Sequence, residues 1–178
     1  MVGLAPAAHG GNRTGRVFTG DASGDFLWAA LWRAGLADRP SSRRADDGLT
    51  LRGVRIGAAV RCAPPANKPT IDERDACAPF LARELAALDG VRVVVALGQF
   101  GWDAALRALA GLGADRPSPR PRFGHLAEVA LESAEGRRWT LLGSYHPSQQ
   151  NTFTGRLTAA MFDAVIERAK DLAGRGAS

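Results

Sequence analysis

The stretch Val91-Arg92-Val93-Val94-Val95-Ala96-Leu97 decides the fold class of this 178-residue chain. It is short, rich in β-branched side chains and apolar almost throughout, which is typical of a strand buried on both faces of a parallel sheet. Gly98 ends the stretch, and the apolar spacing from Trp102 to Leu112 predicts an amphipathic helix after it. A buried strand followed by such a helix indicates the α/β class.

Strands and helices are predicted to alternate on both sides of this stretch. Strands are expected at residues 49–60, 125–131 and 139–144, and helices at 25–36, from the capping-box pattern at Thr70 onward, and at 156–173. Residues 1–4 are expected to be the end of a strand whose earlier part is missing, because a buried strand usually has about five residues. We therefore predict one domain over residues 1–178 that lacks its N-terminal segment. Its fold is a three-layer α/β/α sandwich with a central, mainly parallel four- to five-stranded sheet.

The composition narrows the class of partner. A net charge of +5, with 46% hydrophobic and 23% charged residues, suits a folded globular protein that contacts a polyanion such as DNA. An arginine-rich, high-GC composition explains the same charge, so both readings stay open. No apolar run reaches the about 18 residues of a membrane span, and no signal peptide is recognisable. We expect a cytoplasmic protein without a membrane partner.

In folds of this class, ligands bind outside the carboxyl ends of the parallel strands. That rule brings four segments to one edge of the predicted sheet: residues 3–21, 62–67, 98–99 and 144–151. One of them contains His146-Pro147-Ser148-Gln149-Gln150-Asn151, in which an imidazole at a strand end is stiffened by proline and followed by hydrogen-bonding side chains. Such a segment suits an enzyme that acts on a base in a nucleic acid, although His146 could also be a structural histidine at a strand end.

A second motif lies near the start of the chain. It reads Gly3-Leu4-Ala5-Pro6-Ala7-Ala8-His9-Gly10-Gly11-Asn12-Arg13-Thr14-Gly15-Arg16, followed by Thr19-Gly20-Asp21. Together with the segment at His146, this motif resembles the uracil-DNA glycosylase superfamily and, within it, the type 5 (b-type) branch, over about residues 2–172. The resemblance implies a monofunctional repair glycosylase that hydrolyses the N-glycosidic bond of uracil and other deaminated bases in DNA after base flipping.

The resemblance also implies roles for individual residues. Gly3 belongs to the base-binding set, Phe18 stacks on the flipped base, and the side-chain amide of Asn67 reads the uracil edge. His146 donates a hydrogen bond to the departing base. Each has a plain alternative: Phe18 could anchor a loop in the core, and Asn67 could be a turn residue.

The catalytic water is assigned less directly. The best-known branch of the superfamily has an aspartate at the position of Ala5 and a tyrosine at that of Ala7. Asp21 is therefore the nearest carboxylate that could position the water, although it could equally cap a helix. The small side chain of Ala7 removes a steric wall, which predicts a broad range of bases.

Contacts to DNA outside the base site are also expected, with single- or double-stranded DNA as the partner of a monomer. Arg13, Arg16 and Arg156 are predicted to contact phosphates, although surface arginines are often only solvated. Residues 148–151, which are Ser148, Gln149, Gln150 and Asn151, resemble the wedge that fills the gap left by the flipped base.

The chain has two cysteines, Cys62 and Cys77, and no secretion signal, which argues against a structural disulfide. The resemblance implies that they are two ligands of a [4Fe-4S] cluster, which ordinarily needs four thiolates. The other two ligands are absent from this chain, which indicates either a truncated chain or a protein that has lost its cluster. Alternatively, both thiols are small buried side chains.

Two other functions compete with the glycosylase. A relative that binds uracil-containing DNA covalently or without turnover would keep the same base-binding residues, but no histidine-bearing insert precedes His146. A nucleotide-binding module that uses Gly10-Gly11 for phosphates would need a helix directly after a short loop, and here the loop is too long. The four tryptophans are interpreted as packing residues.

Overall fold

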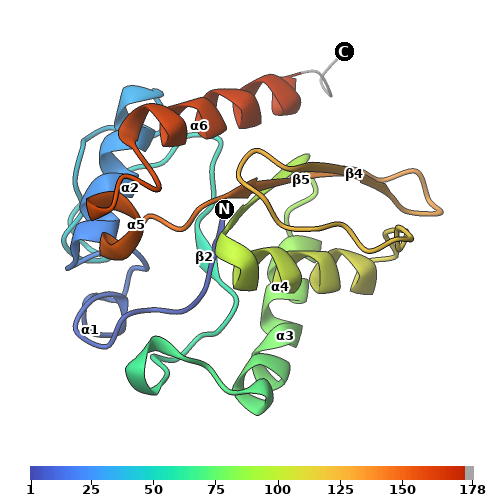
Figure 1. Ribbon diagram of the computed structural model, residues 1–178, viewed down its shortest axis with the longest axis horizontal. Helices are drawn as coiled ribbons and strands as arrows, with labels where there is room; N and C mark the ends of the chain where they lie inside the picture. The colour runs from blue at the N-terminus through green and yellow to red at the C-terminus, as the bar shows by residue number, and fades with distance from the viewer. Residues whose placement is uncertain (175–178) are drawn as a thin grey trace.

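A computed structural model describes residues 1–174 and confirms the α/β sandwich; the last four residues of the predicted domain, 175–178, lie outside the described part. Five strands form one sheet in the order β2-β1-β3-β5-β4 (Figure 1). These strands are β1 (Val2–Gly3), β2 (Gly57–Ala58), β3 (Val93–Leu97), β4 (Glu128–Glu132) and β5 (Arg138–Ser144). The pairs β1–β2, β1–β3 and β3–β5 are parallel, and β4 runs antiparallel to β5.

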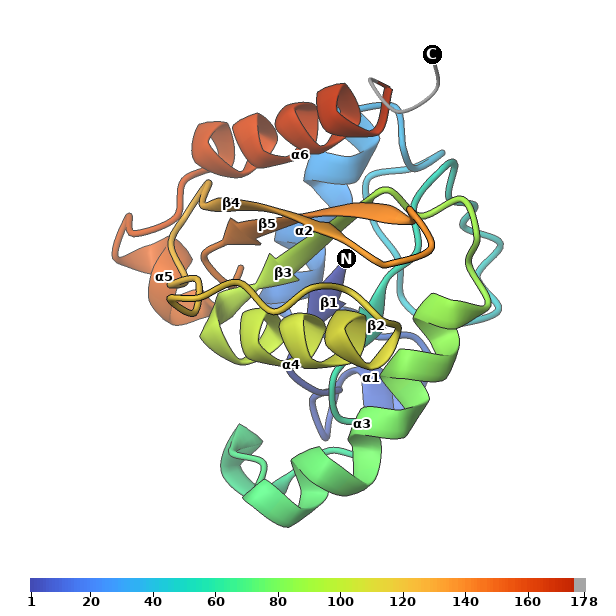
Figure 2. The same cartoon turned by 90° about the vertical axis from the view of Figure 1, so that its right-hand side faces the viewer.

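Helices cover both faces of the sheet. On one side, α4 (Gly98–Gly111) contacts β1, β3 and β5 and packs against α3 (Ile71–Ala86). On the other, α6 (Ala159–Gly174) contacts β3 and β5 and packs against α2 (Ala22–Arg33). Figure 2 shows the sheet edge-on between α6 and α4. No helix among residues 1–174 is long and apolar enough to cross a bilayer.

The alternation of side chains along β3 explains why its sequence is apolar throughout. Val94 and Ala96 point into the core beneath α3 and α4, while Val95 and Leu97 point into the core beneath α2 and α6. Each of these side chains is almost completely buried. Since both faces of the strand are covered, a polar residue has no solvent-facing position within it.

Several predicted boundaries need correction. Within the predicted strand at residues 49–60, only Gly57–Ala58 pairs in the sheet, because Gly53 turns the chain with a φ of +65° and Leu51 bridges to Ala37 instead. The first long helix begins three residues before its predicted start, at Ala22, and the last begins at Ala159. Three short helices were not predicted: α1 (Gly11–Thr14), the 3-10 helix η1 (Pro65–Asn67) and α5 (Gln149–Phe153).

The predicted helix start at Thr70 is confirmed at atomic detail. The Glu73 amide donates to Thr70 Oγ1 at 3.1 Å, and the Thr70 amide donates to Glu73 Oε2 at 2.7 Å. This reciprocal pair satisfies two amides that would otherwise lack partners at the start of α3.

Candidate functional site

The carboxyl ends of β1, β3 and β5 meet at one edge of the sheet, and the loops that follow them form the candidate site. Gly3 ends β1, and the ring of Phe18 packs directly on it: a Cβ atom at residue 3 would lie 2.8 Å from Phe18 Cζ. That separation is too short for any side chain, so only glycine leaves room for the ring. The two residues predicted to bind the base are thus in contact.

The backbone at Phe18 is fixed by residues of α2. Phe18 has a φ of 58°, a left-handed conformation that is rare outside glycine. Its carbonyl oxygen accepts a hydrogen bond of 2.5 Å from Trp28 Nε1, and a Cβ atom at Gly24 would lie 2.1 Å from that oxygen. Trp28 and Gly24 therefore position the ring, a role that their helical spacing in the sequence did not show.

His146 lies next to Phe18. The two ring centroids are 5.8 Å apart, with an angle of 33° between the ring planes. Gly98, at a φ of +86°, brings the start of α4 close to His146. A Cβ atom added at residue 98 would lie 3.4 Å from His146 Cβ. Burial lowers the pKa of His146, and the negative charge of Asp21 raises it by less, so the imidazole is neutral at pH 7. A neutral imidazole can still donate one hydrogen bond.

Asp21 has two roles that its two oxygens separate. Oδ1 accepts a hydrogen bond of 2.9 Å from the Gly24 amide and so caps α2, as the structural alternative predicted. Oδ2 lies above Gly10, where a Cβ atom would be 3.4 Å away. Ala7 lies beside Gly10 as well, since the Ala7 Cβ would be 3.3 Å from the Cβ atom added at residue 10. Capping therefore leaves one carboxylate oxygen directed at Gly10.

Asn67 ends η1 with a φ of 55°, and its side chain is exposed. Among residues 1–174, the Asn67 side chain forms no hydrogen bond with Phe18 or His146. The structure thus brings together Gly3, Phe18, Asp21 and His146, and it leaves Asn67 on a separate loop. Its role in reading the base stays a prediction.

Tyr145, the residue before His146 in the chain, is itself held by His125. Its ring stacks on His125 with centroids 5.0 Å apart, and its amide donates to His125 Nδ1 at 3.3 Å. The guanidinium of Arg156 lies 4.8 Å from the centre of the Tyr145 ring. Neither His125 nor Tyr145 was singled out in the sequence, because their stacking depends on a loop and a strand meeting in space.

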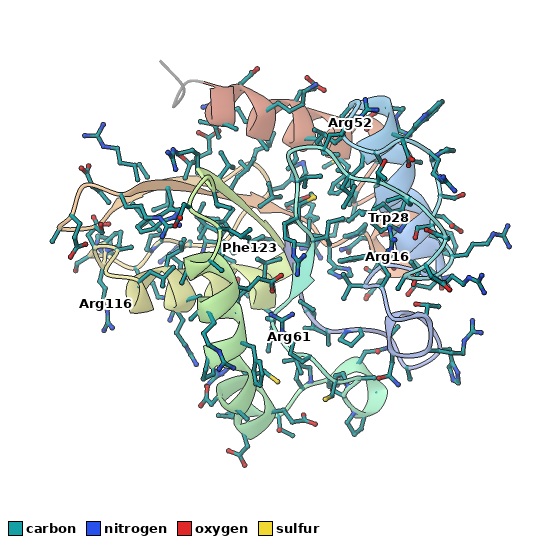
Figure 3. The ribbon with its side chains drawn as sticks, turned by 180° about the vertical axis from the view of Figure 1, so that it is seen from behind. Arg16, Trp28, Arg52, Arg61, Arg116 and Phe123 are labelled. Atoms are coloured by element: carbon teal, nitrogen blue, oxygen red, sulfur yellow. The ribbon has the colours of Figure 1, made fainter. Side chains whose placement is uncertain are left out.

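The predicted phosphate contacts differ in their surroundings. Arg16 is held by the protein itself: it donates to the Ala45 carbonyl at 2.8 Å, forms an ion pair of 3.5 Å with Asp47 and lies over Trp28 (Figure 3). Arg13 is exposed, and within residues 1–174 its guanidinium donates only to the His9 carbonyl, at 3.2 Å. The phosphate roles of all three arginines stay predictions, and Arg13 and Arg156 are the two with exposed side chains.

The segment after His146 forms α5. The Asn151 side-chain amide donates to the His146 carbonyl at 2.8 Å, which ties the helix to the histidine. Gln149 and Gln150 are exposed, and Ser148 is the residue before the helix. Figure 1 shows α5 and α1 on the same side of the molecule, beyond the carboxyl ends of the strands.

The two cysteines lie close together but do not make a complete metal site. The backbone amide of Arg61, the residue before Cys62, donates a hydrogen bond of 3.5 Å to Cys77 Sγ. Figure 3 shows Arg61 beside α3, the helix that carries Cys77. Both thiols are free, and residues 1–174 contain no group of three or more ligands that could hold a metal ion. Two thiolates do not fit a cluster that takes four. The [4Fe-4S] cluster therefore stays a prediction that this chain alone does not satisfy.

One cavity that the described residues line is elsewhere. It measures about 690 Å³ and lies at the amino ends of β1, β2 and β3, where Met1, Val91 and the end of α6 meet. It contains none of the residues that carry the site chemistry. We therefore place the site at the opposite edge of the sheet, on the basis of its side chains.

Fold and site together define an α/β protein whose parallel strands end at an aromatic ring, an imidazole and a carboxylate. Comparison with known proteins identifies the group. The Uracil DNA glycosylase superfamily model matches residues 1–170. The chain is 57% identical to the type-5 uracil-DNA glycosylase of Mycobacterium tuberculosis over 175 residues, which is 98% of this chain and 62% of that protein.

Further relatives agree. Type-5 uracil-DNA glycosylases of Mycobacterium leprae and Thermus thermophilus are both 55% identical, over 98% of this chain and over 73% and 75% of their own lengths. The chain therefore belongs to the uracil-DNA glycosylase superfamily, in its type-5 branch. This confirms the resemblance seen in the two motifs. The chain spans less than two thirds of the length of the Mycobacterium tuberculosis relative.

Proposed function

We propose that this chain is a monofunctional glycosylase that hydrolyses the N-glycosidic bond of uracil in DNA. The observation that carries the proposal is the pairing of Phe18, which packs on the glycine that ends β1, with His146, whose ring centroid lies 5.8 Å from that of Phe18. An aromatic face beside a hydrogen-bond donor suits a planar base that leaves with negative charge. The relatives, which are named as uracil-DNA glycosylases, support the same activity.

The reaction can be written from these residues. A flipped uracil stacks on Phe18, and the neutral imidazole of His146 donates a hydrogen bond to the O2 atom of the base. As the bond from C1′ to N1 breaks, its electron pair moves onto the base, and the hydrogen bond becomes stronger. Water attacks C1′ and gives up a proton, first to the Asp21 carboxylate; a proton then reaches the uracil anion through solvent, and the products are neutral uracil and an abasic sugar. We assign the positioning of this water to the free oxygen of Asp21.

A broad base range is part of the proposal. Ala5 and Ala7 carry only methyl groups, and Ala7 borders the place that Asp21 Oδ2 faces. A larger side chain at residue 7 would narrow this place and exclude substituted pyrimidines or purines. Replacing Ala7 with tyrosine should therefore lower release of hypoxanthine and xanthine more than release of uracil.

We also expect a monomer to be active, because one chain supplies Gly3, Phe18, Asp21 and His146. Light scattering at the enzyme concentration of the assay tests this directly. A mass equal to one chain together with full activity would support it, and activity confined to a dimer would contradict it.

The test of the function is release of free base from a duplex with one uracil opposite guanine. The wild-type protein should release several equivalents of uracil per protein molecule. His146→Ala should lower the rate of release by about 100-fold or more, the usual cost of losing a preorganised donor. Phe80→Ala, on the outer face of α3, is the matched control and should keep the wild-type rate.

The same assay separates the competing function. Release of at most one equivalent, with protein retained on the DNA after denaturation, would mean covalent capture instead of turnover. Tight binding of uracil-containing DNA without release of base would mean a binding protein. Either result would refute the proposed hydrolysis.

A further inference from the structure

His125, in the loop before β4, holds the backbone where β5 gives way to the segment that carries His146. β5 ends at Ser144, and the amide of the next residue, Tyr145, donates to His125 Nδ1 at 3.3 Å. One residue further, the His146 carbonyl accepts a hydrogen bond of 2.8 Å from the Asn151 side chain. Two side chains therefore fix the chain around His146, at a point where the strand itself has ended.

The loop that carries His125 is in turn fixed to β5. The Leu126 amide donates to the Gly143 carbonyl, and the Gly143 amide donates to the Ala127 carbonyl, both at 2.8 Å. A Cβ atom at residue 143 would collide with the Gly124 carbonyl oxygen, so the loop can lie this close only because residue 143 is glycine. The imidazole of His125 is thus presented from a rigid support.

The imidazole of His125 is held in one orientation and one tautomer. Its ring stacks on that of Tyr145, with an angle of 25° between the ring planes. Burial lowers the pKa of His125, and the backbone of Met161 raises it by less, so the ring is neutral at pH 7. Because Nδ1 accepts the Tyr145 amide, the one proton of the neutral ring is on Nε2, which is buried.

Packing alone does not require a histidine at residue 125. A phenylalanine could stack on Tyr145 in the same way, and Phe123 already packs against that ring with centroids 6.3 Å apart. What histidine adds is the acceptor nitrogen. Without an acceptor, the peptide group before Tyr145 could turn, and the direction of the following residue, His146, would change with it.

We propose that His125 is a positioning residue: by accepting the Tyr145 amide, it fixes the direction in which the His146 imidazole points. The inference rests on the proposed function, because it assumes that His146 donates to the departing base. A misplacement of about 1 Å in a group that acts on the substrate can cost about 100-fold in rate. A partner one residue away from the donor can therefore control the reaction without touching DNA.

The first experiment measures kcat and KM for uracil release from a duplex with uracil opposite guanine. His125→Phe keeps the stack and removes the acceptor, so it should lower kcat by about tenfold or more and change KM by less than about twofold. His125→Asn places a side-chain oxygen near the position of Nδ1 and should restore kcat to within about threefold of wild type.

Ile166→Val is the matched control for a loss of stability without a change at the site. It removes one buried carbon from α6, beside the cavity at the opposite edge of the sheet. The control should lower Tm by a few degrees and keep the wild-type kcat.

The second experiment does not depend on activity. The chain has three histidines, so labelling histidine with nitrogen-15 gives few imidazole signals, and single replacements assign them. At pH 7.5, wild-type His125 should be a neutral ring with its proton on Nε2. The His146 signals should shift in His125→Phe and keep their wild-type positions in His125→Asn and in Ile166→Val.

The outcomes separate the two proposals. A proton on Nδ1 of His125, or His146 signals that do not move in His125→Phe, would refute the positioning role. A wild-type kcat in His125→Phe would refute it as well, and so would an equal loss of kcat in His125→Asn and His125→Phe while both keep a Tm at or above that of Ile166→Val. In each of these cases the glycosylase stands. If the wild-type protein releases no uracil, the proposed function fails, and the nitrogen signals still decide whether His125 holds His146.

Discussion

Replacing Gly3 with alanine should impair the site while leaving the fold almost intact. The new Cβ atom would lie 2.8 Å from Phe18 Cζ and 2.9 Å from Cε2, and its next neighbour, the Gly57 carbonyl oxygen, is 3.8 Å away. To restore an ordinary carbon contact of about 3.5 Å, the ring must move back by about 0.7 Å. Gly3 is not among the glycines with a positive φ, so the backbone itself is not strained.

The expected magnitude follows from that displacement. A shift of about 1 Å in a group that positions the substrate can cost about 100-fold, and complete loss of base stacking corresponds to about 1–3 kcal/mol. We therefore expect kcat/KM for uracil release to fall by about 10- to 100-fold. The free energy of unfolding should change by less than about 1 kcal/mol, because the far end of the Phe18 ring can give way.

The assay pairs uracil release with urea unfolding of the same samples. Gly90→Ala is the matched control, since a Cβ there meets nothing within 4 Å. The decisive comparison is a double-mutant cycle with Phe18→Ala. If Gly3 acts through the ring, Gly3→Ala should cost almost nothing in the Phe18→Ala background. An equal cost in both backgrounds would refute the reasoning.

Three further predictions use the same assays. Asp21→Ser should keep the cap on α2 and the stability but lose turnover, whereas Asp21→Ala should lose turnover and also about 1 kcal/mol of stability; equal turnover in wild type and Asp21→Ser would remove the carboxylate from the mechanism. The pKa of His146 is lowered in the folded state, so its contribution to stability is complete above the ordinary value of about 6.5 and is lost as the pH falls below it. Urea unfolding at pH 7.5 and 5.5 should therefore show a smaller loss of stability on acidification in His146→Gln than in wild type, and an unchanged loss would contradict the assignment. Trp28→Phe leaves the Phe18 carbonyl without its partner, which should cost about 1–3 kcal/mol of stability and lower kcat/KM; wild-type values in both measurements would show that the indole does not hold the loop.

The fold was predictable where a local pattern and the tertiary environment agree. The run from Val91 to Leu97 is apolar because both of its faces are buried, and the Thr70 capping box acts within four residues. The strand predicted at residues 49–60 failed because alternation alone does not show whether a neighbouring strand is present. At Gly53 the chain turns, and two residues remain in the sheet.

The site was predictable at the level of motifs and less so at the level of contacts. Gly3, Phe18, Asp21 and His146 were selected from motifs, and they lie together because parallel strands end at the same edge. Trp28, Gly24 and Tyr145 could not be selected, since each acts through a contact made only after the chain folds. A tryptophan at helical spacing carries no sign that its indole nitrogen faces a loop.

The double use of Asp21 limits how this position can evolve. One oxygen of a short carboxylate caps a helix while the other faces Gly10. Glutamate places its carboxylate one methylene further from the backbone and is a poor replacement at a helix start. Serine and asparagine keep the helix end and lose the negative charge. Selection for stability and selection for catalytic rate therefore act on the same residue. A relative that no longer needs the catalytic carboxylate should still keep a small polar residue at this position, because the helix cap remains useful.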